Sequence, residues 1–430
     1  MNRAASEPEV RDAIAALMRR VYRAGMTTTS GGNISVRDGN GTIWITPAGR
    51  DKGALRGEEI PGFHADGTYE GRHPPSSELP FHRAIYAARP DLGAVIHAHP
   101  AALVAFSIVR QRPDLRDLPE AAAVCGRIGY ATYATPGEEE LGMLIAGEFR
   151  AGCDAVIMEN HATVVGGKTL EDAILRFETF EHAAQVLIRA RALGHVAAAE
   201  GSPDQAPRAA RPDWPEAQPP VNSVLREAER EELAAMARRC AAQGLAPAAL
   251  GCLSLRLGAD DFLVTPGGVA LNTLQPGQIA RIREGSREPG PEPHAAAAAH
   301  RAIYLADPGT AAIVTAQPRD LMAFAVAGVK PDVRTIPESW ILLRDLPLLP
   351  AGSPLADSDG FARRFGRECP AVLVRNEGIY STGACLLEAF DRLEVAEFSA
   401  RSLILGRSLG DMRPIGERQV EALRRKFFPS

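Results

Sequence analysis

Two histidines one residue apart, His97 and His99, are the residues whose type and spacing point most directly to chemistry. They follow the apolar residues 94–96 and end what we expect to be a buried strand. Side chains two apart on a strand point the same way, so both imidazoles should project together as a pair of metal ligands. Hydrogen bonds at a sheet edge satisfy many His-x-His pairs, so the pair alone leaves both interpretations open.

Two further residues favour a metal centre. A zinc site that acts on substrates has three protein ligands and one open position. His161 can supply the third imidazole, because it follows a second short apolar run, residues 155–160. Glu78, in the polar cluster 74–78, can serve as a general acid/base. The sequence therefore predicts a metal site of His97, His99 and His161, with Glu78 beside it.

The elements that must position these residues read as an α/β domain. Helical periodicity predicts a helix over 9–23, another opening at Glu78, and a long helix over 169–193. The glycine-containing stretches 27–37 and 41–49 are typical of turns that run into strands. We expect Gly166 and Gly167 to break the chain before the long helix. Strands that alternate with helices indicate an α/β fold.

Composition narrows the class of protein. The chain has 430 residues, which favours two or three domains, and a net charge of −5 without a basic stripe. We therefore expect no nucleic-acid partner. The six cysteines are widely spaced, and no apolar run reaches membrane-spanning length. These features predict a cytoplasmic protein with no membrane partner.

The second half of the chain repeats the first. The segment His82–Tyr86 recurs identically as His300–Tyr304, and residues 312–318 match the strand that carries His97. A stretch rich in Ala and Pro separates the halves and is typical of a linker. We therefore predict a domain at 1–197, a linker at 198–222 and a second domain at 223–430.

The proposed chemistry is missing from the second copy. Thr315 and Gln317 stand where His97 and His99 do, and the replacements for the other site residues are Glu377 for His161, Ala296 for Glu78, Cys252 for Asn33 and His294 for Ser76. We expect the second domain to keep the fold, to be non-catalytic and to have a structural role. A new ligand site around His294 and Glu377 remains an alternative.

These motifs resemble the class II aldolase/adducin family. The resemblance covers roughly residues 10–195, with a degenerate copy at about 225–410. It rests on the segments Gly32–Ser35, Thr46–Gly49, Ser76–Glu78, His97–His99 and Asn160–His161. The resemblance implies tandem three-layer α/β/α domains with a mainly antiparallel central sheet. It also implies a homo-oligomer, either a dimer of tandem chains or a larger assembly, with active sites between neighbouring protomers.

The resemblance also implies roles for the site residues. His97, His99 and His161 would bind Zn²⁺, and Glu78 would be the catalytic acid/base. Lys52 follows the Gly49 turn and is either a phosphate ligand or a solvated side chain. The residues that would bind the substrate phosphate, here called the phosphate cradle, are Ser30, Gly32, Asn33, Gly49, Ser76 and Ser77.

The activity that follows is a zinc-dependent aldolase, an aldehyde-lyase of carbohydrate metabolism. It would cleave a phosphorylated ketose similar to fuculose 1-phosphate into dihydroxyacetone phosphate and an aldehyde. Dehydration, decarboxylation or epimerisation of a sugar phosphate at the same metal site is the alternative chemistry. A non-catalytic, adducin-like assembly module is the alternative from a different class.

Overall fold

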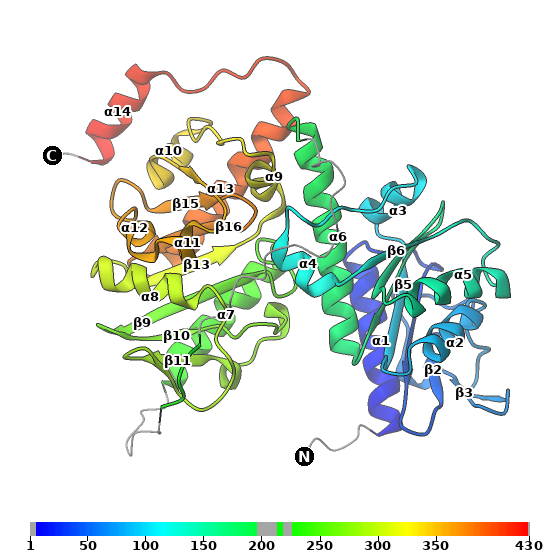
Figure 1. Ribbon diagram of the computed structural model, residues 1–430. Coiled ribbons are helices and arrows are strands. Elements are labelled where there is room, and N and C mark those ends of the chain that lie inside the picture. The colour runs from blue at the N-terminus through cyan, green and yellow to red at the C-terminus, as the bar shows by residue number, and fades with distance from the viewer. Residues whose placement is uncertain (1–5, 196–212, 218–225, 429–430) are drawn as a thin grey trace. The chain divides into compact units, whose positions relative to one another are not determined.

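The computed structural model describes residues 6–195, 213–217 and 226–428 (Figure 1). Contacts divide the chain into two compact units. The first unit comprises Met1–Asp114 and Ala121–Ala184, and the second comprises Leu115–Glu120 and Gln185–Ser430. Apart from 213–217, the predicted linker 198–222 lies outside the described residues.

The first unit is built on an eight-stranded sheet in the order β4-β3-β2-β1-β5-β8-β7-β6. All neighbouring strands are antiparallel except β6 and β7, which are parallel. The expected mainly antiparallel sheet is therefore confirmed. The strands are β1 (Asn33–Arg37), β2 (Ile43–Ile45), β3 (Gly62–Phe63), β4 (Tyr69–Glu70), β5 (Ala94–Ala98), β6 (Ile128–Ala131), β7 (Ala155–Met158) and β8 (Ala162–Gly167).

Helices cover both faces of this sheet. On one face α2 and α5 bury Phe81, Ile85 and Phe149 against Val95 and Val164 of the strands. The helices α1 and α6 lie on the opposite face, which gives the expected three layers (Figure 1). The helices are α1 (Glu7–Arg23), the 3₁₀ turn η1 (Gly57–Glu59), α2 (Leu79–Ala88), α3 (Ala101–Ile108), α4 (Pro119–Cys125), α5 (Glu139–Arg150) and α6 (Leu170–Ala192).

The expectation that Gly166 and Gly167 break the chain is wrong. Both belong to β8, a central strand that pairs with β5 and β7. A Cβ on Gly167 would lie 2.4 Å from the backbone nitrogen of Ala173, and one on Gly166 would lie 2.6 Å from a methyl group of Leu92. The glycines are needed because α6 and Leu92 approach the strand closely.

The second unit repeats this architecture, which confirms the tandem duplication. Its sheet has the order β12-β11-β10-β9-β13-β16-β15-β14, and only β14 and β15 are parallel neighbours among its described strands. Its strands are β9 (Gly251–Gly258), β10 (Asp261–Val264), β11 (Ala280–Arg283), β12 (Ser286–Arg287), β13 (Ala312–Ala316), β14 (Leu348–Leu349), β15 (Ala371–Val374) and β16 (Gly378–Gly383). Its helices are α7 (Glu227–Ala242), η2 (Leu271–Thr273), η3 (Pro276–Gln278), α8 (Ala297–Ala306), α9 (Arg319–Ala327), α10 (Pro337–Leu343), α11 (Ser353–Ala356), α12 (Ser358–Ala362), α13 (Leu386–Arg407) and α14 (Glu417–Phe427).

The two copies also share a buried polar network. In each, a strand serine hydroxyl lies within hydrogen-bond distance of both a histidine Nδ1 and a tyrosine hydroxyl, at 2.7–2.9 Å. These groups need partners because burying an unpaired polar group is costly. The sets are Ser35, His82 and Tyr86 in the first copy and Ser254, His300 and Tyr304 in the second.

Candidate metal centre and active site

Three imidazoles meet at the ends of interior strands of the first sheet. His97 lies on β5, His99 follows that strand, and His161 lies in the turn from β7 to β8. The turn is tight, because Asn160 adopts the left-handed conformation at φ +50°. The Nε2 atoms of His97 and His99 are 3.2 Å apart, and one nitrogen from each of the three rings lies within 4.8 Å of the others. The predicted ligands are therefore together.

The donor set fits a divalent cation. The Nδ1–H of His97 donates to the carbonyl of Thr163 at 2.9 Å, so its Nε2 lone pair faces the other rings. Nitrogens bound at about 2.1 Å to a tetrahedral zinc ion lie about 3.4 Å apart, close to the 3.2 Å between the Nε2 atoms of His97 and His99. Burial, then the nearby His97, lowers the pKa of both His99 and His161 to about 4. Neutral imidazole, the form that binds metal, is thus favoured at these two rings.

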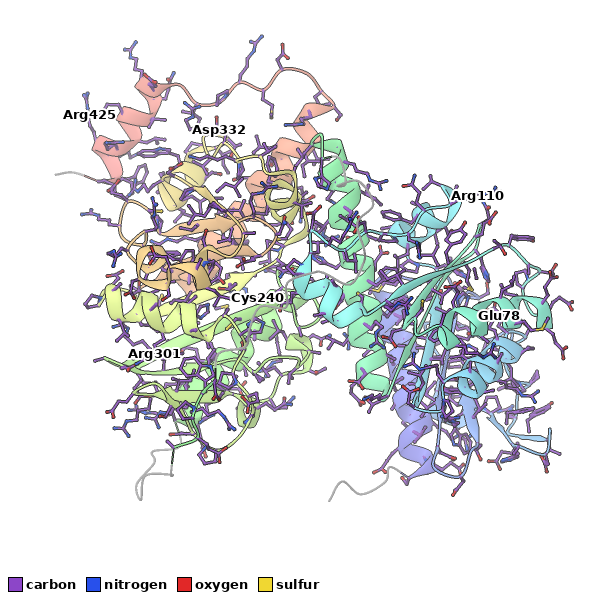
Figure 2. All side chains as sticks on the ribbon, in the orientation of Figure 1. Glu78, Arg110, Cys240, Arg301, Asp332 and Arg425 are labelled. Atoms are coloured by element: carbon purple, nitrogen blue, oxygen red, sulfur yellow. The ribbon has the colours of Figure 1, made fainter. Side chains whose placement is uncertain are left out.

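Glu78 is the residue immediately before α2, and it is labelled in Figure 2. Its carboxylate lies beside the three imidazoles. Its Oε2 lies 3.2 Å from Nε2 of His97, and its Oε1 lies 3.6 Å from Nε2 of His161. Burial opposes its charge, but the two imidazoles and the Asn33 amide outweigh burial and lower the pKa of Glu78. Glu78 is therefore a carboxylate that can accept a proton beside the proposed ligands.

Asn33 orients that carboxylate. Its Nδ2 donates to Glu78 Oε2 at 2.7 Å and to the Ser76 hydroxyl at 3.1 Å. Its Oδ1 accepts from Nε2–H of His82, whose Nδ1 accepts from the Ser35 hydroxyl. Burial lowers the pKa of His82 to about 3, consistent with this neutral tautomer. The network thus holds the amide with its NH₂ group toward Glu78.

The predicted phosphate cradle is brought together only in part. Asn33 and Ser76 are in contact, and Gly32 supplies a φ of +73° where a Cβ would lie 2.8 Å from the His97 carbonyl. Gly49 turns at φ +64°, and an isolated bridge between Pro47 and Pro75 joins its turn to the loop that precedes α2. Ser30 and Ser77, by contrast, are exposed at the surface.

Lys52 is buried, not solvated. Its side chain is 2% exposed, and its Nζ donates to the Pro47 carbonyl at 3.0 Å. Burial lowers the pKa of Lys52 to about 8, and the charge of Glu78 partly opposes that shift. The structure thus holds a desolvated amine against the turn of Gly49.

Sequence reasoning missed three residues that support the site. Gly31 packs against His99, Thr163 orients His97, and Glu181 accepts the backbone N–H groups of Ala102 and Leu103 at the start of α3. Only the Gly31-Gly32 pair carried a sequence signal, since adjacent glycines favour close backbone approach. Thr163 and Glu181 act through contacts that local pattern does not reveal.

Among its described residues, the second unit contains no equivalent cluster. Within the described parts of the chain, His97, His99 and His161 are the group of three potential ligands close enough to share an ion. The hydroxyl of Thr315, the counterpart of His97, instead lies 2.7 Å from His300 Nε2.

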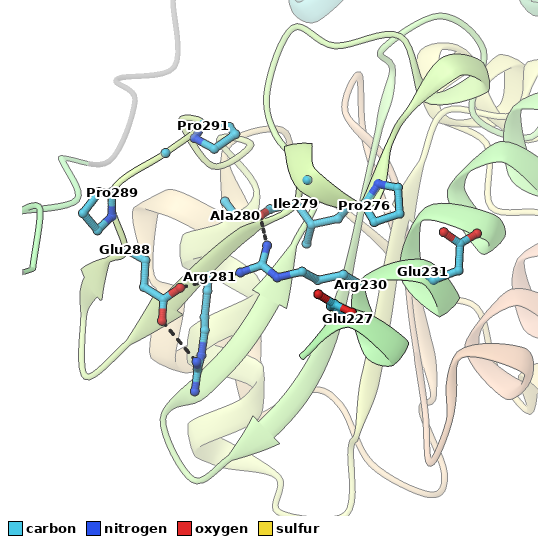
Figure 3. A pocket seen from close by; sticks show the side chains of 12 residues that line it. Glu227, Arg230, Glu231, Pro276, Ile279, Ala280, Arg281, Glu288, Pro289 and Pro291 are labelled. Atoms are coloured by element: carbon cyan, nitrogen blue, oxygen red, sulfur yellow. Dashed lines mark hydrogen bonds and ion pairs between the residues drawn. The ribbon is translucent and has the colours of Figure 1, made fainter. Parts of the chain in front are cut away.

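A pocket of about 650 Å³ in the second unit is lined by Arg230, Arg281 and Glu288, among others (Figure 3). Both guanidinium groups are engaged: Arg281 pairs with Asp261 and Glu288, and Arg230 donates to the Ile279 carbonyl. These pairings make the pocket a poor anion site.

In the parts of the chain that the structure describes, no helix is both long and apolar enough to cross a membrane.

Comparisons with known proteins agree with the fold and with the duplication. The family model for the class II aldolase and adducin N-terminal domain matches residues 12–188 and again residues 231–404. These matches span more than half of the chain, so the protein belongs to the class II aldolase/adducin family, with two copies of its domain.

Several relatives of different activity resemble one copy. An L-fuculose phosphate aldolase of Methanococcus maripaludis is 34% identical over 171 residues, 40% of this chain and 91% of the relative. A 5-methylthioribulose-1-phosphate/5-deoxyribulose-1-phosphate aldolase of Rhodospirillum rubrum is 37% identical over 36% of this chain and 70% of its own. A 3-oxo-tetronate 4-phosphate decarboxylase of Pectobacterium atrosepticum is 29% identical over 42% and 85%. A solved L-fuculose 1-phosphate aldolase is 29% identical, covers 45% of this chain and 90% of its own, and has a TM-score of 0.41.

Proposed function

We propose that the first domain, residues 1–197, is a zinc-dependent class II aldolase, and that the second, residues 223–430, is non-catalytic. The substrate of the first domain would be a phosphorylated ketose similar to fuculose 1-phosphate, and the products would be dihydroxyacetone phosphate and an aldehyde. The observation that carries the proposal is the convergence of His97, His99 and His161 on one point with the Glu78 carboxylate beside them. Similarity to aldolases that act on ketose phosphates supports it.

His97, His99 and His161 would hold the ion. Imidazole binds a metal in its neutral form, so this set of ligands would leave the charge of the ion undiminished. A bound divalent ion supplies Lewis-acid stabilisation of the negative charge that develops on substrate oxygens. The Thr163 carbonyl keeps His97 in the tautomer that presents Nε2. Ligand orientation is therefore set before the substrate arrives.

Glu78 would move the proton. Its carboxylate accepts the proton of the hydroxyl whose carbon becomes the aldehyde, and the carbon–carbon bond breaks with its electron pair left on the dihydroxyacetone phosphate fragment. Returning the proton to the carbon of the dihydroxyacetone phosphate fragment that received the electron pair completes the reaction. Asn33 keeps one oxygen of Glu78 occupied at 2.7 Å and so restricts how the carboxylate turns. General acid–base catalysis of this kind is typically worth ~10²–10⁴-fold in rate.

The phosphate group would bind around Asn33, Ser76, Gly32 and Gly49, with Ser30 and Ser77 closing over it from the surface. Backbone N–H groups in glycine turns can approach an anion closely. The amine of Lys52, held against the Gly49 turn, would add a positive charge once protonated. Holding the phosphate positions the carbons that react.

The protein would act as a homo-oligomer, as a dimer of tandem chains or a larger assembly. Three large apolar side chains on α13, Leu387, Phe398 and Leu405, are 51–62% exposed. Their spacing places them on one face of the helix, and exposed apolar side chains on a shared face favour contact with another protomer. Light scattering coupled to gel filtration tests this: Phe398→Glu should lower the measured mass, and an unchanged mass would remove this face from the interface.

A second candidate activity is decarboxylation of a 3-oxo-tetronate 4-phosphate, favoured by the similarity to the Pectobacterium enzyme. Dehydration or epimerisation would use the same ligands and base. The decisive experiment incubates zinc-loaded protein with L-fuculose 1-phosphate, 5-methylthioribulose 1-phosphate and a 3-oxo-tetronate 4-phosphate. Release of dihydroxyacetone phosphate from L-fuculose 1-phosphate or 5-methylthioribulose 1-phosphate supports the aldolase, whereas release of carbon dioxide together with dihydroxyacetone phosphate from the 3-oxo-tetronate 4-phosphate supports the decarboxylase. Purified protein that binds no zinc and turns over none of the three would support an adducin-like module.

A further inference from the structure

The second unit holds a carboxylate where its copy of the fold has lost the metal ligands. Glu120, which belongs to this unit, places Oε1 3.0 Å from Nε2 of His294 and Oε2 2.6 Å from Nε2 of Gln317. Each carboxylate oxygen therefore has one nitrogen donor of its own. Two-point contacts of this kind fix a planar anion in position as well as orientation.

The two donors, His294 and Gln317, are buried and need an acceptor. Nδ1 of His294 accepts the backbone N–H of Ala296 at 3.1 Å, so Nε2 is the nitrogen that carries a hydrogen and donates to Glu120. His294 is 8% exposed and Gln317 is 3% exposed. Buried donors of this kind are costly if left without an acceptor, so the site requires an occupant.

The position of this site in the fold is informative. His294 replaces Ser76 of the phosphate cradle, and Gln317 replaces the proposed metal ligand His99. The strand register supports the alignment, because Asn33 pairs with His97 in the first sheet and Cys252 pairs with Thr315 in the second. Where the first copy has a proposed phosphate ligand and a proposed metal ligand, the second copy thus has two polar side chains that donate hydrogen bonds.

The segment that carries Glu120 is anchored at more than one point. Leu115 and Leu118 are buried, and Asp117 lies 3.2 Å from Nε2 of His195 and accepts from Asn376 at 3.4 Å. All of these residues belong to the second unit. Tethering raises the local concentration of the Glu120 carboxylate, so the chain itself is the favoured occupant.

We propose that the second domain is a carboxylate-binding module whose resident ligand is Glu120 of the same chain. His294 and Gln317 recognise the anion, and small free carboxylates such as formate or acetate bind there once the glutamate side chain is removed. The site holds the segment 115–120, which ends in the first turn of α4, in a fixed place. This proposal does not depend on the reaction of the first domain.

Chemical rescue tests the proposal on the full chain. Glu120→Ala should lower the midpoint of thermal unfolding by roughly 3 °C. Formate should restore most of that loss with a saturable dose dependence, while chloride at the same ionic strength should not. The matched control is Glu338→Ala, because Glu338 occupies the equivalent Pro-Glu position of the second copy and is exposed. That variant should keep the midpoint of the parent and show no formate response.

A double variant identifies the donors. Glu120→Ala combined with Gln317→Ala should lose the formate response, and the two substitutions should be less than additive in stability. If Glu120→Ala does not fold, Glu120→Gln replaces it in the same cycle with Gln317→Ala. The proposal is wrong if formate stabilises Glu120→Ala no more than it stabilises the control, if the double variant keeps the formate response, or if the effects of the two substitutions on stability simply add.

Discussion

A Cβ atom on Gly31 would lie 2.7 Å from Nδ1 of His99. The backbone of the first glycine turn therefore lies against one of the three imidazoles, and no larger residue fits without moving that ring. The relationship ties a loop with no ligand of its own to the geometry of the metal centre.

Gly31→Ala should weaken metal binding. Displacing His99 by a few tenths of an ångström removes one ligand from its favoured position, and we expect a loss of about tenfold or more in zinc affinity, as for other groups that orient ligands. Competition with a chromogenic chelator measures the affinity. Gly39→Ala is the control, because a Cβ at Gly39 meets nothing within 4 Å. Equal affinities for both variants would contradict the assigned role of Gly31.

His97→Ala should abolish metal binding and turnover together. His97 is fully buried and lies nearest to both Glu78 and His99, so two ligands alone should not retain the ion. The duplication supplies its own control in Thr315→Ala, which removes a hydrogen bond to His300 but no proposed ligand. Elemental analysis should find about one zinc per chain in the control and almost none in His97→Ala. Loss of zinc from Thr315→Ala would show that the second copy takes part in binding.

Glu78→Gln should separate chemistry from metal binding. The amide keeps the shape of the side chain and can still accept from Asn33, but it cannot take up a proton. We expect kcat to fall by ~10²–10⁴-fold while the zinc content stays near that of the parent. Glu58→Gln, at an exposed carboxylate on η1, should change neither quantity. A variant at Glu78 with full activity would remove it as the acid/base.

Lys52 should make stability depend on pH. Its folded-state pKa is about 8, whereas the unfolded value is 10.5. Between these values the unfolded chain binds more protons, so the free energy of unfolding should rise with pH, by up to about 3 kcal/mol in total. Below pH 8 both states are protonated, and the cost of burying the charge is constant.

Lys52→Met removes this cost and should therefore be more stable than the parent at pH 7, with the difference vanishing near pH 10.5. Urea unfolding at several pH values measures it. Lys168→Met, at an exposed position, should leave the pH profile unchanged. A parent protein whose stability falls steadily from pH 8 to 10, in parallel with Lys52→Met, would mean that the amine is solvated after all.

The meeting of His97, His99 and His161 could be foreseen because each follows an apolar run that reads as a strand. Alternation on β5 points two rings the same way, and the antiparallel β5, β8 and β7 bring the third ring to the same end of these strands. Identical segments such as His82–Tyr86 and His300–Tyr304 likewise predicted the duplication, because repeated sequence folds to repeated structure.

Other features depend on contacts that no local pattern records. Gly166 and Gly167 led the sequence analysis to expect a break where the strand β8 continues. These positions are glycines because α6 and Leu92 approach the strand closely. The exposure of Ser30 and Ser77, the burial of Lys52 and the pairing of Glu120 with His294 each depend on segments distant in the chain. Their neighbours are set by tertiary packing, which composition and periodicity do not specify.

The serine–histidine–tyrosine network has a consequence for how this duplicated chain can change. It persists beside β9 and β13, where there are no imidazole ligands left to support, so its retention there reflects a demand of folding. In an enzyme with a single copy of the domain, residues needed for folding and residues needed for catalysis cannot be told apart by position. Here, residues that both copies keep serve the fold, and residues that only the first copy keeps serve the proposed reaction. A substitution tolerated at His300 but not at His82 would measure that difference within one polypeptide.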